Sequence, residues 1–81
     1  MQTGYDKRGI AYDKPAIIYY NDKKEWWQNG KLHRENDQPA VSDRSGSEEW
    51  WQNSQRHRDN NPAIILSTGY KAWWQNGIFI K

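Results

Sequence analysis

The tetrapeptide Trp-Trp-Gln-Asn occurs three times in this chain of 81 residues, and its spacing constrains the fold more than any other feature. The copies begin at Trp26, Trp50 and Trp73, so they are 24 and 23 residues apart. A Pro-Ala pair precedes each copy by 11 residues, at Pro15, Pro39 and Pro62. Self-similarity at a period of about 20–50 residues is typical of repeat proteins, in which one supersecondary unit stacks on the next. The sequence therefore predicts three related units.

Turn residues divide each unit into short segments with the character of β-strands. Two-residue turns of type I′ need a positive φ at both central residues, which Asn, Asp and Gly tolerate best. The predicted turns are Asn21-Asp22, Ser45-Gly46 and Thr68-Gly69 in the first half of each unit, and Asn29-Gly30, Asn53-Ser54 and Asn76-Gly77 in the second half. No window of about 11 residues keeps a helical period of 3.6. The sequence therefore predicts an all-β fold.

The predicted architecture is an elongated, single-layer antiparallel sheet, a solenoid-like meander of three β-hairpin repeats of 23–24 residues. The repeats are assigned to residues 7–30, 31–54 and 55–81 of a single domain that spans residues 1–81. Leu, Ile, Val and Phe supply only 11 residues, whereas there are six Trp and five Tyr. Large aromatic side chains must therefore form most of the core. The predicted core consists of Trp26, Trp27, Trp50, Trp51, Trp73 and Trp74.

Two-residue turns would also fix which residues face each other across the strands. In the first repeat this register places Trp26 between Ile17 and His33. It also places Glu25 opposite Arg34, and the second repeat has an equivalent Glu and Arg. Exposed ion pairs of this kind contribute only about 0.2–1 kcal/mol, so they would specify the register more than they stabilise it.

Composition and charge exclude several classes of protein. The chain has no Cys, which excludes disulfide scaffolds, thiol catalysis and cysteine zinc sites. The longest apolar runs, residues 16–20 and 63–66, are far too short to cross a bilayer, and the start of the chain has no apolar signal segment. The net charge is only +2. We expect a cytoplasmic protein without a membrane partner.

No residue pattern predicts catalysis, a cofactor or a metal ion. His33 and His57 occupy equivalent places in successive repeats, where stacking holds them apart, and there is no further His. The Ser residues lie in turns or polar strand positions without a nucleophile elbow. A thin sheet also offers no deep pocket that would perturb a carboxylate pKa. We therefore expect no catalytic residue, no cofactor-binding residue and no metal ligand.

The motifs WWQNGKLHRENDQPA and WWQNSQRHRDNNPA resemble the MORN-like repeat variants, whose pattern is Trp-Trp-x-Asn-Gly followed by His-Arg and Pro-Ala. Residues 10–81 fit this pattern. Such variants occur in many uncharacterised proteins of bacteriophages and large DNA viruses. The resemblance implies an extended sheet of hairpins that serves assembly or binding, and a phage-like source. It implies no catalytic residue.

We expect a non-enzymatic protein-binding module, because a single-layer sheet cannot bury both of its faces and exposed Trp, Tyr and Arg favour interfaces. The middle repeat has the most polar first strand, although a middle unit should be the best buried. The predicted partner-binding residues are Asp43, Arg44, Glu48 and Glu49, flanked by Tyr19, Tyr20 and Tyr70. With the phage-like resemblance, the hypothesis is a small inhibitor or adaptor that blocks a host protein or defence complex.

Two other functions fit the same residues. Unpaired strand edges or an uncovered Trp face would allow self-assembly into a homodimer or short filament. Aromatic side chains beside basic residues could bind nucleic acid or phosphate, although the low net charge makes this the less favoured partner. The basic residues that would serve it are Lys7-Arg8, Lys23-Lys24 and Arg56-His57-Arg58.

Overall fold

The structure, a computed structural model, describes residues 15–81 and confirms the all-β prediction. Lys7, Arg8 and the start of the first predicted repeat lie outside the described residues. Six strands form the main antiparallel sheet in the order β1 (Ile17–Ile18), β2 (Lys24–Glu25), β5 (Val41–Ser42), β6 (Glu48–Glu49), β9 (Ile64–Ile65) and β10 (Lys71–Ala72). The other strands form two-stranded sheets: β3 (Trp27–Gln28) with β4 (Lys31–Leu32), β7 (Trp51–Gln52) with β8 (Gln55–Arg56), and β11 (Trp74–Gln75) with β12 (Ile78–Phe79).

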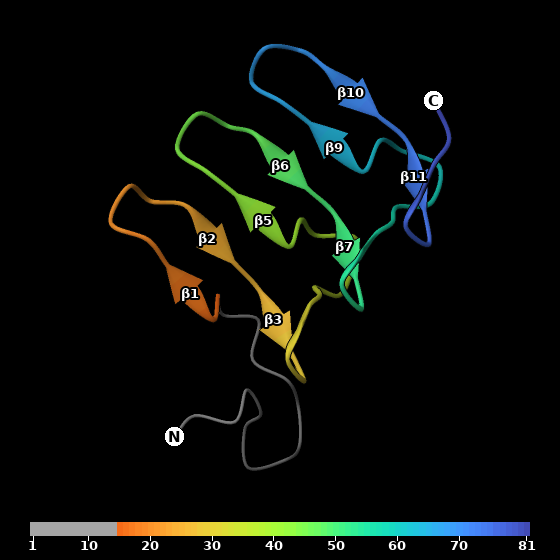
Figure 1. Cartoon of the computed structure of the whole chain (residues 1–81). Helices are drawn as coiled ribbons and strands as arrows, with labels where there is room; N and C mark the ends of the chain where they lie inside the picture. The colour runs from red at the N-terminus through yellow and green to blue at the C-terminus, as the bar shows by residue number, and fades with distance from the viewer. Residues whose placement is uncertain (1–14) are drawn as a thin grey trace.

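Counted from its Pro-Ala pair, over residues 15–38, 39–61 and 62–81, each repeat consists of two hairpins with different roles. The first hairpins, β1–β2, β5–β6 and β9–β10, lie side by side and pair edge to edge, β2 with β5 and β6 with β9. Their loops point to one side of the molecule, and the second hairpins project from the other side (Figure 1). The predicted meander of antiparallel hairpins is confirmed. The predicted rows of three strands in each repeat are not formed, because the chain changes direction between the first and second hairpins.

The register of the second hairpins was predicted correctly. Trp27 pairs with Leu32, and the turn residues Asn29 and Gly30 have φ values of 52° and 76°. Positive φ at both central residues defines the two-residue type I′ turn, whose twist matches that of the flanking strands. The other two second hairpins have the same register, with Trp51 opposite Arg56 and Trp74 opposite Phe79.

The register of the first hairpins was predicted wrongly by one residue. Ile17 pairs with Glu25 and not with Trp26, because the loop contains three residues instead of two. The Tyr19 N–H donates to the Lys23 carbonyl at 2.8 Å, and Asp22 between them has a φ of 69°. A three-residue hairpin loop places its single positive φ at the third loop position. Gly46 and Gly69 occupy that position in the other two repeats, with φ values of 96° and 97°.

A β-bulge follows each Pro, at the start of the first hairpin of the repeat. The Ala16 N–H donates to the Glu25 carbonyl at 2.8 Å, although the strand pairing already places Ile17 opposite Glu25. Two residues opposite one residue define a bulge, which bends the strand and increases its twist. The other repeats have the same arrangement at Ala40 and Ala63.

The predicted ion pairs between Glu25 and Arg34 and between Glu49 and Arg58 are not formed, because in these repeats the pairing of the second hairpin ends at its first Trp, whose N–H donates to the next repeat. The Trp27 Nε1–H donates to Glu25 Oε1 at 3.0 Å. Arg34 instead stacks on the indole of Trp26, with its guanidinium carbon 3.7 Å from the ring centroid. Its Nη1 donates to the Pro39 carbonyl at 3.1 Å, so one side chain covers a Trp and holds the linker to the next repeat.

The core lies where successive repeats meet. The Trp26 N–H donates to the Ala40 carbonyl at 2.8 Å, and the Trp50 N–H donates to the Ala63 carbonyl at 2.7 Å. Both Ala residues are fully buried, and both Trp side chains are buried as well. A small residue beside each indole thus allows the repeats to approach closely.

The six predicted core Trp residues differ in burial. Trp50 is 5% exposed, whereas Trp27 is 38% exposed. Trp27 departs from the prediction because no second hairpin of an earlier repeat packs against it within residues 15–81, whereas β4 packs against β7. Trp26 is buried like Trp50, and Trp51, Trp73 and Trp74 are half-buried.

We predict that Trp50→Ala lowers the free energy of unfolding by about 3–5 kcal/mol, because it leaves a cavity at the centre of the array. Trp27→Ala should cost clearly less, since that side chain is already 38% exposed. Urea unfolding followed by circular dichroism measures both values. Equal losses for the two variants would show that the repeat junction is not the core.

Candidate functional site

The loops of the three first hairpins form an exposed surface of aromatic and charged side chains. We call it the tip surface and define it as Tyr19, Tyr20, Asp22, Asp43, Arg44 and Tyr70. Tyr20 is completely exposed, and Tyr19 and Tyr70 expose 40% and 53% of their surface. The three loops lie in a row on the side of the molecule away from the second hairpins (Figure 1). Five of the seven predicted partner-binding residues belong to this surface.

Asp43 organises the loop of the middle repeat. Its Oδ1 accepts hydrogen bonds from the Ser45 hydroxyl at 2.6 Å, the Ser45 N–H at 2.9 Å and the Ser47 N–H at 3.1 Å. The Ser45 hydroxyl bond is the main reason that the pKa of Asp43 lies below its ordinary value of 3.8. Burial opposes this effect by raising the pKa, and the backbone N–H groups of the loop lower it further. The loop is therefore held in one conformation by the ionised carboxylate.

Arg44 links the loops of the first two repeats. Its Nε and Nη2 donate to Asp22 Oδ2 at 3.0 and 2.6 Å. Both side chains are more than half exposed, so solvent screening leaves the pair with little effect on stability. Its effect is geometric, because it keeps the charged loop of the middle repeat next to Tyr20 and the rest of the first loop.

The other two predicted residues, Glu48 and Glu49, lie on β6 and not at the tips. Glu49 shares its face of the sheet with Asp43, since both follow the alternation that starts at Val41, the strand partner of Glu49. Glu49 Oε1 accepts a hydrogen bond from the Trp51 Nε1–H at 3.0 Å, so this carboxylate is engaged within its own repeat. Glu48 is on the opposite face, so the structure does not bring it together with Asp43.

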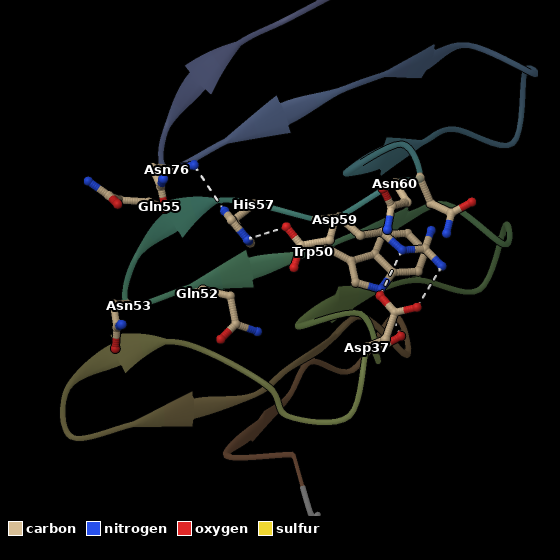
Figure 2. A pocket seen from close by; sticks show the side chains of 11 residues that line it. Asp37, Trp50, Gln52, Asn53, Gln55, His57, Asp59, Asn60 and Asn76 are labelled. Atoms are coloured by element: carbon tan, nitrogen blue, oxygen red, sulfur yellow. Dashed lines mark hydrogen bonds and ion pairs between the residues drawn. The ribbon is translucent and has the colours of Figure 1, made fainter.

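A polar groove of about 560 Å³ lies between the second hairpins and the linkers after them. Its lining consists of Asp37, Trp50, Gln52, Asn53, Gln55, His57, Arg58, Asp59, Asn60, Asn61 and Asn76. Figure 2 shows that several of these side chains point toward one another. Arg58 Nε donates to Asp37 Oδ1 at 2.9 Å, and the Trp50 Nε1–H donates to the Asp37 carbonyl at 3.0 Å. The groove is thus a junction in which one repeat holds the linker of another.

The two His residues connect each repeat to the turn of the next. His33 Nδ1 accepts from the Asn53 N–H at 3.1 Å, and His57 Nδ1 accepts from the Asn76 N–H at 3.0 Å. An accepting Nδ1 carries no proton, so each ring has its proton on Nε2. His57 Nε2 lies 3.3 Å from Asp59 Oδ1, which the dashed lines of Figure 2 include.

Sequence reasoning missed these two contacts and the stacking of Arg34 and Arg58 on Trp26 and Trp50. The available signal was the recurrence of His-Arg at a constant distance after Trp-Trp-Gln-Asn. A recurrence in step with the repeat indicates a contact that every repeat junction makes.

The described part of the chain has neither a cluster of metal ligands nor a membrane-spanning helix. Residues 15–81 contain no group of three or more His, Asp or Glu side chains that could hold a metal ion. Within the same residues, no helix has the length and apolar character needed to cross a membrane.

Comparison of the chain with known protein families, with characterised proteins and with solved structures finds no match. The resemblance to MORN-like variants thus rests on the repeated Trp-Trp, His-Arg and Pro-Ala motifs. It stays a prediction.

We predict that Asp43→Asn lowers stability most at neutral pH. A carboxylate with a lowered pKa stabilises the fold above its ordinary pKa of 3.8, and this effect is lost as the pH falls through the folded-state value. The gap between the free energies of unfolding of wild type and variant should therefore narrow in acid. Urea unfolding between pH 7 and pH 2 measures it, and a constant gap would contradict the role of the charge.

We predict that His57→Leu speeds hydrogen exchange at the Asn76 amide and costs roughly 0.5–1.5 kcal/mol of stability, because this N–H loses its acceptor. His33→Leu is the matched control, since it should affect the Asn53 amide and leave Asn76 unchanged. Amide exchange followed by NMR separates the two. Unaltered exchange at Asn76 in His57→Leu would refute the contact.

Proposed function

We propose that this chain is a non-enzymatic protein-binding module and that the tip surface contacts its partner. The observation that supports this best is the exposure of Tyr19 and Tyr20 at the loop of the first repeat and of Tyr70 at the loop of the third. Tyr presents a large, rigid, amphipathic surface at a low cost in conformational entropy, and it is enriched among residues that dominate binding energies. Ile18, which is 61% exposed beside the first loop, adds apolar area to this region.

The charged groups of the tip surface suit recognition because they are already ordered. The Asp43 carboxylate is fixed by its own loop, and Arg44 is fixed by Asp22. A surface that is ordered before binding loses less entropy when a partner docks. Alternating aromatic and charged groups match a protein surface of mixed character, in which polar contacts surround a few apolar anchors.

The resemblance to MORN-like variants of phages and large DNA viruses supports a more specific proposal. In this proposal the module is a small inhibitor or adaptor that acts in the cytoplasm of an infected cell. It would occupy the binding surface of a host protein, such as a component of a defence complex. A blocking protein of this kind needs only a complementary surface, which fits the absence of a predicted catalytic residue.

Nucleic-acid binding remains the competing proposal, and the burial of Trp argues against it. Trp26 and Trp50 are buried, and Arg58 stacks on Trp50 while it pairs with Asp37. Base stacking requires an aromatic face that is open to the ligand. The net charge of +2 also provides little release of counterions.

Capture of the tagged protein's partners from bacterial lysate, with and without nuclease, tests the proposal. We predict a stoichiometric partner that survives nuclease and loses at least about tenfold in affinity with Tyr20→Ser/Tyr70→Ser, since each truncated anchor costs about 1 kcal/mol or more. Both side chains are mostly exposed, so the variant should fold. The purified partner and titration calorimetry give the affinities.

Phe79→Ser is the matched control, because Phe79 is an exposed aromatic residue on a second hairpin, away from the tips. It should keep the wild-type affinity for the partner. Equal affinity of wild type and the Tyr double variant would refute the tip surface. Capture that disappears with nuclease would refute protein binding in favour of nucleic acid.

A further inference from the structure

Each internal junction in the array buries the same two surfaces. The strand edge of β2 pairs with β5, with Lys24 opposite Ser42, and the edge of β6 pairs with β9, with Glu48 opposite Ile65. The second hairpins also meet, because β4 packs against β7 and β8 packs against β11. A repeat therefore offers its successor one strand edge and one hairpin face.

The third repeat offers the same two surfaces, and within residues 15–81 no further strand or hairpin pairs with them. β10 is the last strand of the six-stranded sheet, and it corresponds to β2 and β6. On β12 and the residue after it, Ile78, Phe79 and Ile80 are 66%, 54% and 55% exposed. Their equivalents in the first two repeats are Lys31, Leu32 and His33, and Gln55, Arg56 and His57.

The terminal face is thus more apolar than the faces that are buried inside the array. Terminal repeats of a solenoid normally present a polar outer face, which keeps the protein soluble. Here Ile80 replaces a His, and Phe79 packs edge to face on Trp74 at 5.5 Å while most of its other side faces outward. This reversal of polarity indicates an interface.

The opposite end of the sheet carries the surface that would fit it. β1 is the other edge strand among the described residues, and the segment Pro15-Ala16-Ile17-Ile18 is identical in sequence to Pro62-Ala63-Ile64-Ile65, which docks on β6. Ala63 is fully buried beside Trp50, whereas Ala16 is exposed. The β1 end therefore has the sequence of a docked repeat, but no repeat among residues 15–81 covers it.

We propose that the β10 end of one copy of this chain binds the β1 end of a second copy, so that the sheet continues from one molecule to the next. By the register of the internal junctions, Lys71 would pair with Ile18 of the second copy and Ala72 with its Ile17. Phe79 would then lie against Trp27 of the second copy, as β8 lies against β11. The second copy fits because two internal junctions of this chain already have this geometry.

Two features of the β10 end are compatible with docking. A Lys on an edge strand often prevents pairing, but Lys24 occupies the equivalent place in β2 and pairs with Ser42. The Trp73 N–H donates to the Lys81 carbonyl at 2.9 Å, where the equivalent N–H groups donate to Ala carbonyls of the next repeat. Replacing Lys81 by Ala16 of the second copy exchanges one carbonyl acceptor for another, so no hydrogen bond is lost.

The proposed contact is heterologous, since it joins two different surfaces and leaves one of each free. Such contacts form open chains unless the rotation between copies closes a ring. The free ends predict dimers and longer assemblies whose population rises with concentration. The proposal does not depend on the tip surface, which lies on the loops and remains accessible in every copy.

Proline substitutions at the two edges test the proposal. The N–H groups of Tyr19 and Leu66 bond within their own hairpins, and alternation along the strands turns those of Ile18 and Lys71 toward the free edges. Ile18→Pro removes the N–H at one end, and Lys71→Pro removes it at the other. Each variant alone should sediment as a monomer of 9.7 kDa, and their equimolar mixture should form a one-to-one dimer.

Wild type should exceed the monomer mass at high concentration, and Ile18→Thr and Lys71→Thr, which keep the N–H, should behave like wild type. Wild type that stays monomeric at all concentrations in analytical ultracentrifugation would overturn the proposal. A single Pro variant that still dimerises would overturn it in favour of a two-fold contact. If circular dichroism shows that either Pro variant is unfolded, Ala16→Glu and Ile80→Glu replace the pair with the same expected results.

Discussion

The architecture depends on one backbone hydrogen bond that is made twice, from the N–H of Trp26 or Trp50 to an Ala carbonyl of the next repeat. The bond brings a buried indole beside a buried Ala and leaves the outer face of the indole to an Arg, whose guanidinium carbon lies 3.7 Å from the ring centroid in both repeats. The chain has few aliphatic residues, so it relies on this combination of dispersion and cation–π attraction. The strands are only two residues long, and the junctions join the inner ones to the neighbouring repeat.

The sequence was sufficient to predict the fold class and the second hairpins, because the Asn-Gly or Asn-Ser pair after each Trp-Trp-Gln tolerates the positive φ that a two-residue type I′ turn needs. It was insufficient for the first hairpins. Asp22, Gly46 and Gly69 tolerate a positive φ both in a two-residue turn and at the third position of a three-residue loop. The sequence pattern does not distinguish these loops, and a difference of one residue exchanges every strand partner. The bulge at Ala16 shifts the strand pairing a second time, and no local sequence pattern indicates it.

The candidate site could be predicted in part, for a related reason. Tyr20 and Arg44 were identified because exposed aromatic and Arg side chains favour interfaces, and loop residues remain near the tips whichever loop length is chosen. Glu48 could not be placed, since its face of the sheet follows from the register. Asp43 was expected to contact a partner. In the structure its carboxylate binds and orders its own loop. The contacts of His33 and His57 depend on where the turn of the next repeat lies, which only the packed array defines.

The linker after His33 is one residue longer than the linker after His57, yet both lead into the same bulge and the same junction. The longer linker takes up its extra residue with positive φ at both Asn36 and Asp37. Variation in linker length therefore stays local, because each repeat presents to its successor the same kind of surface as the one on which it docks itself. Gain or loss of a whole repeat would then leave both ends chemically unchanged while it lengthens or shortens the row of loops. Duplication of one repeat in the gene would lengthen the array by one pair of hairpins, and every junction would keep its present contacts.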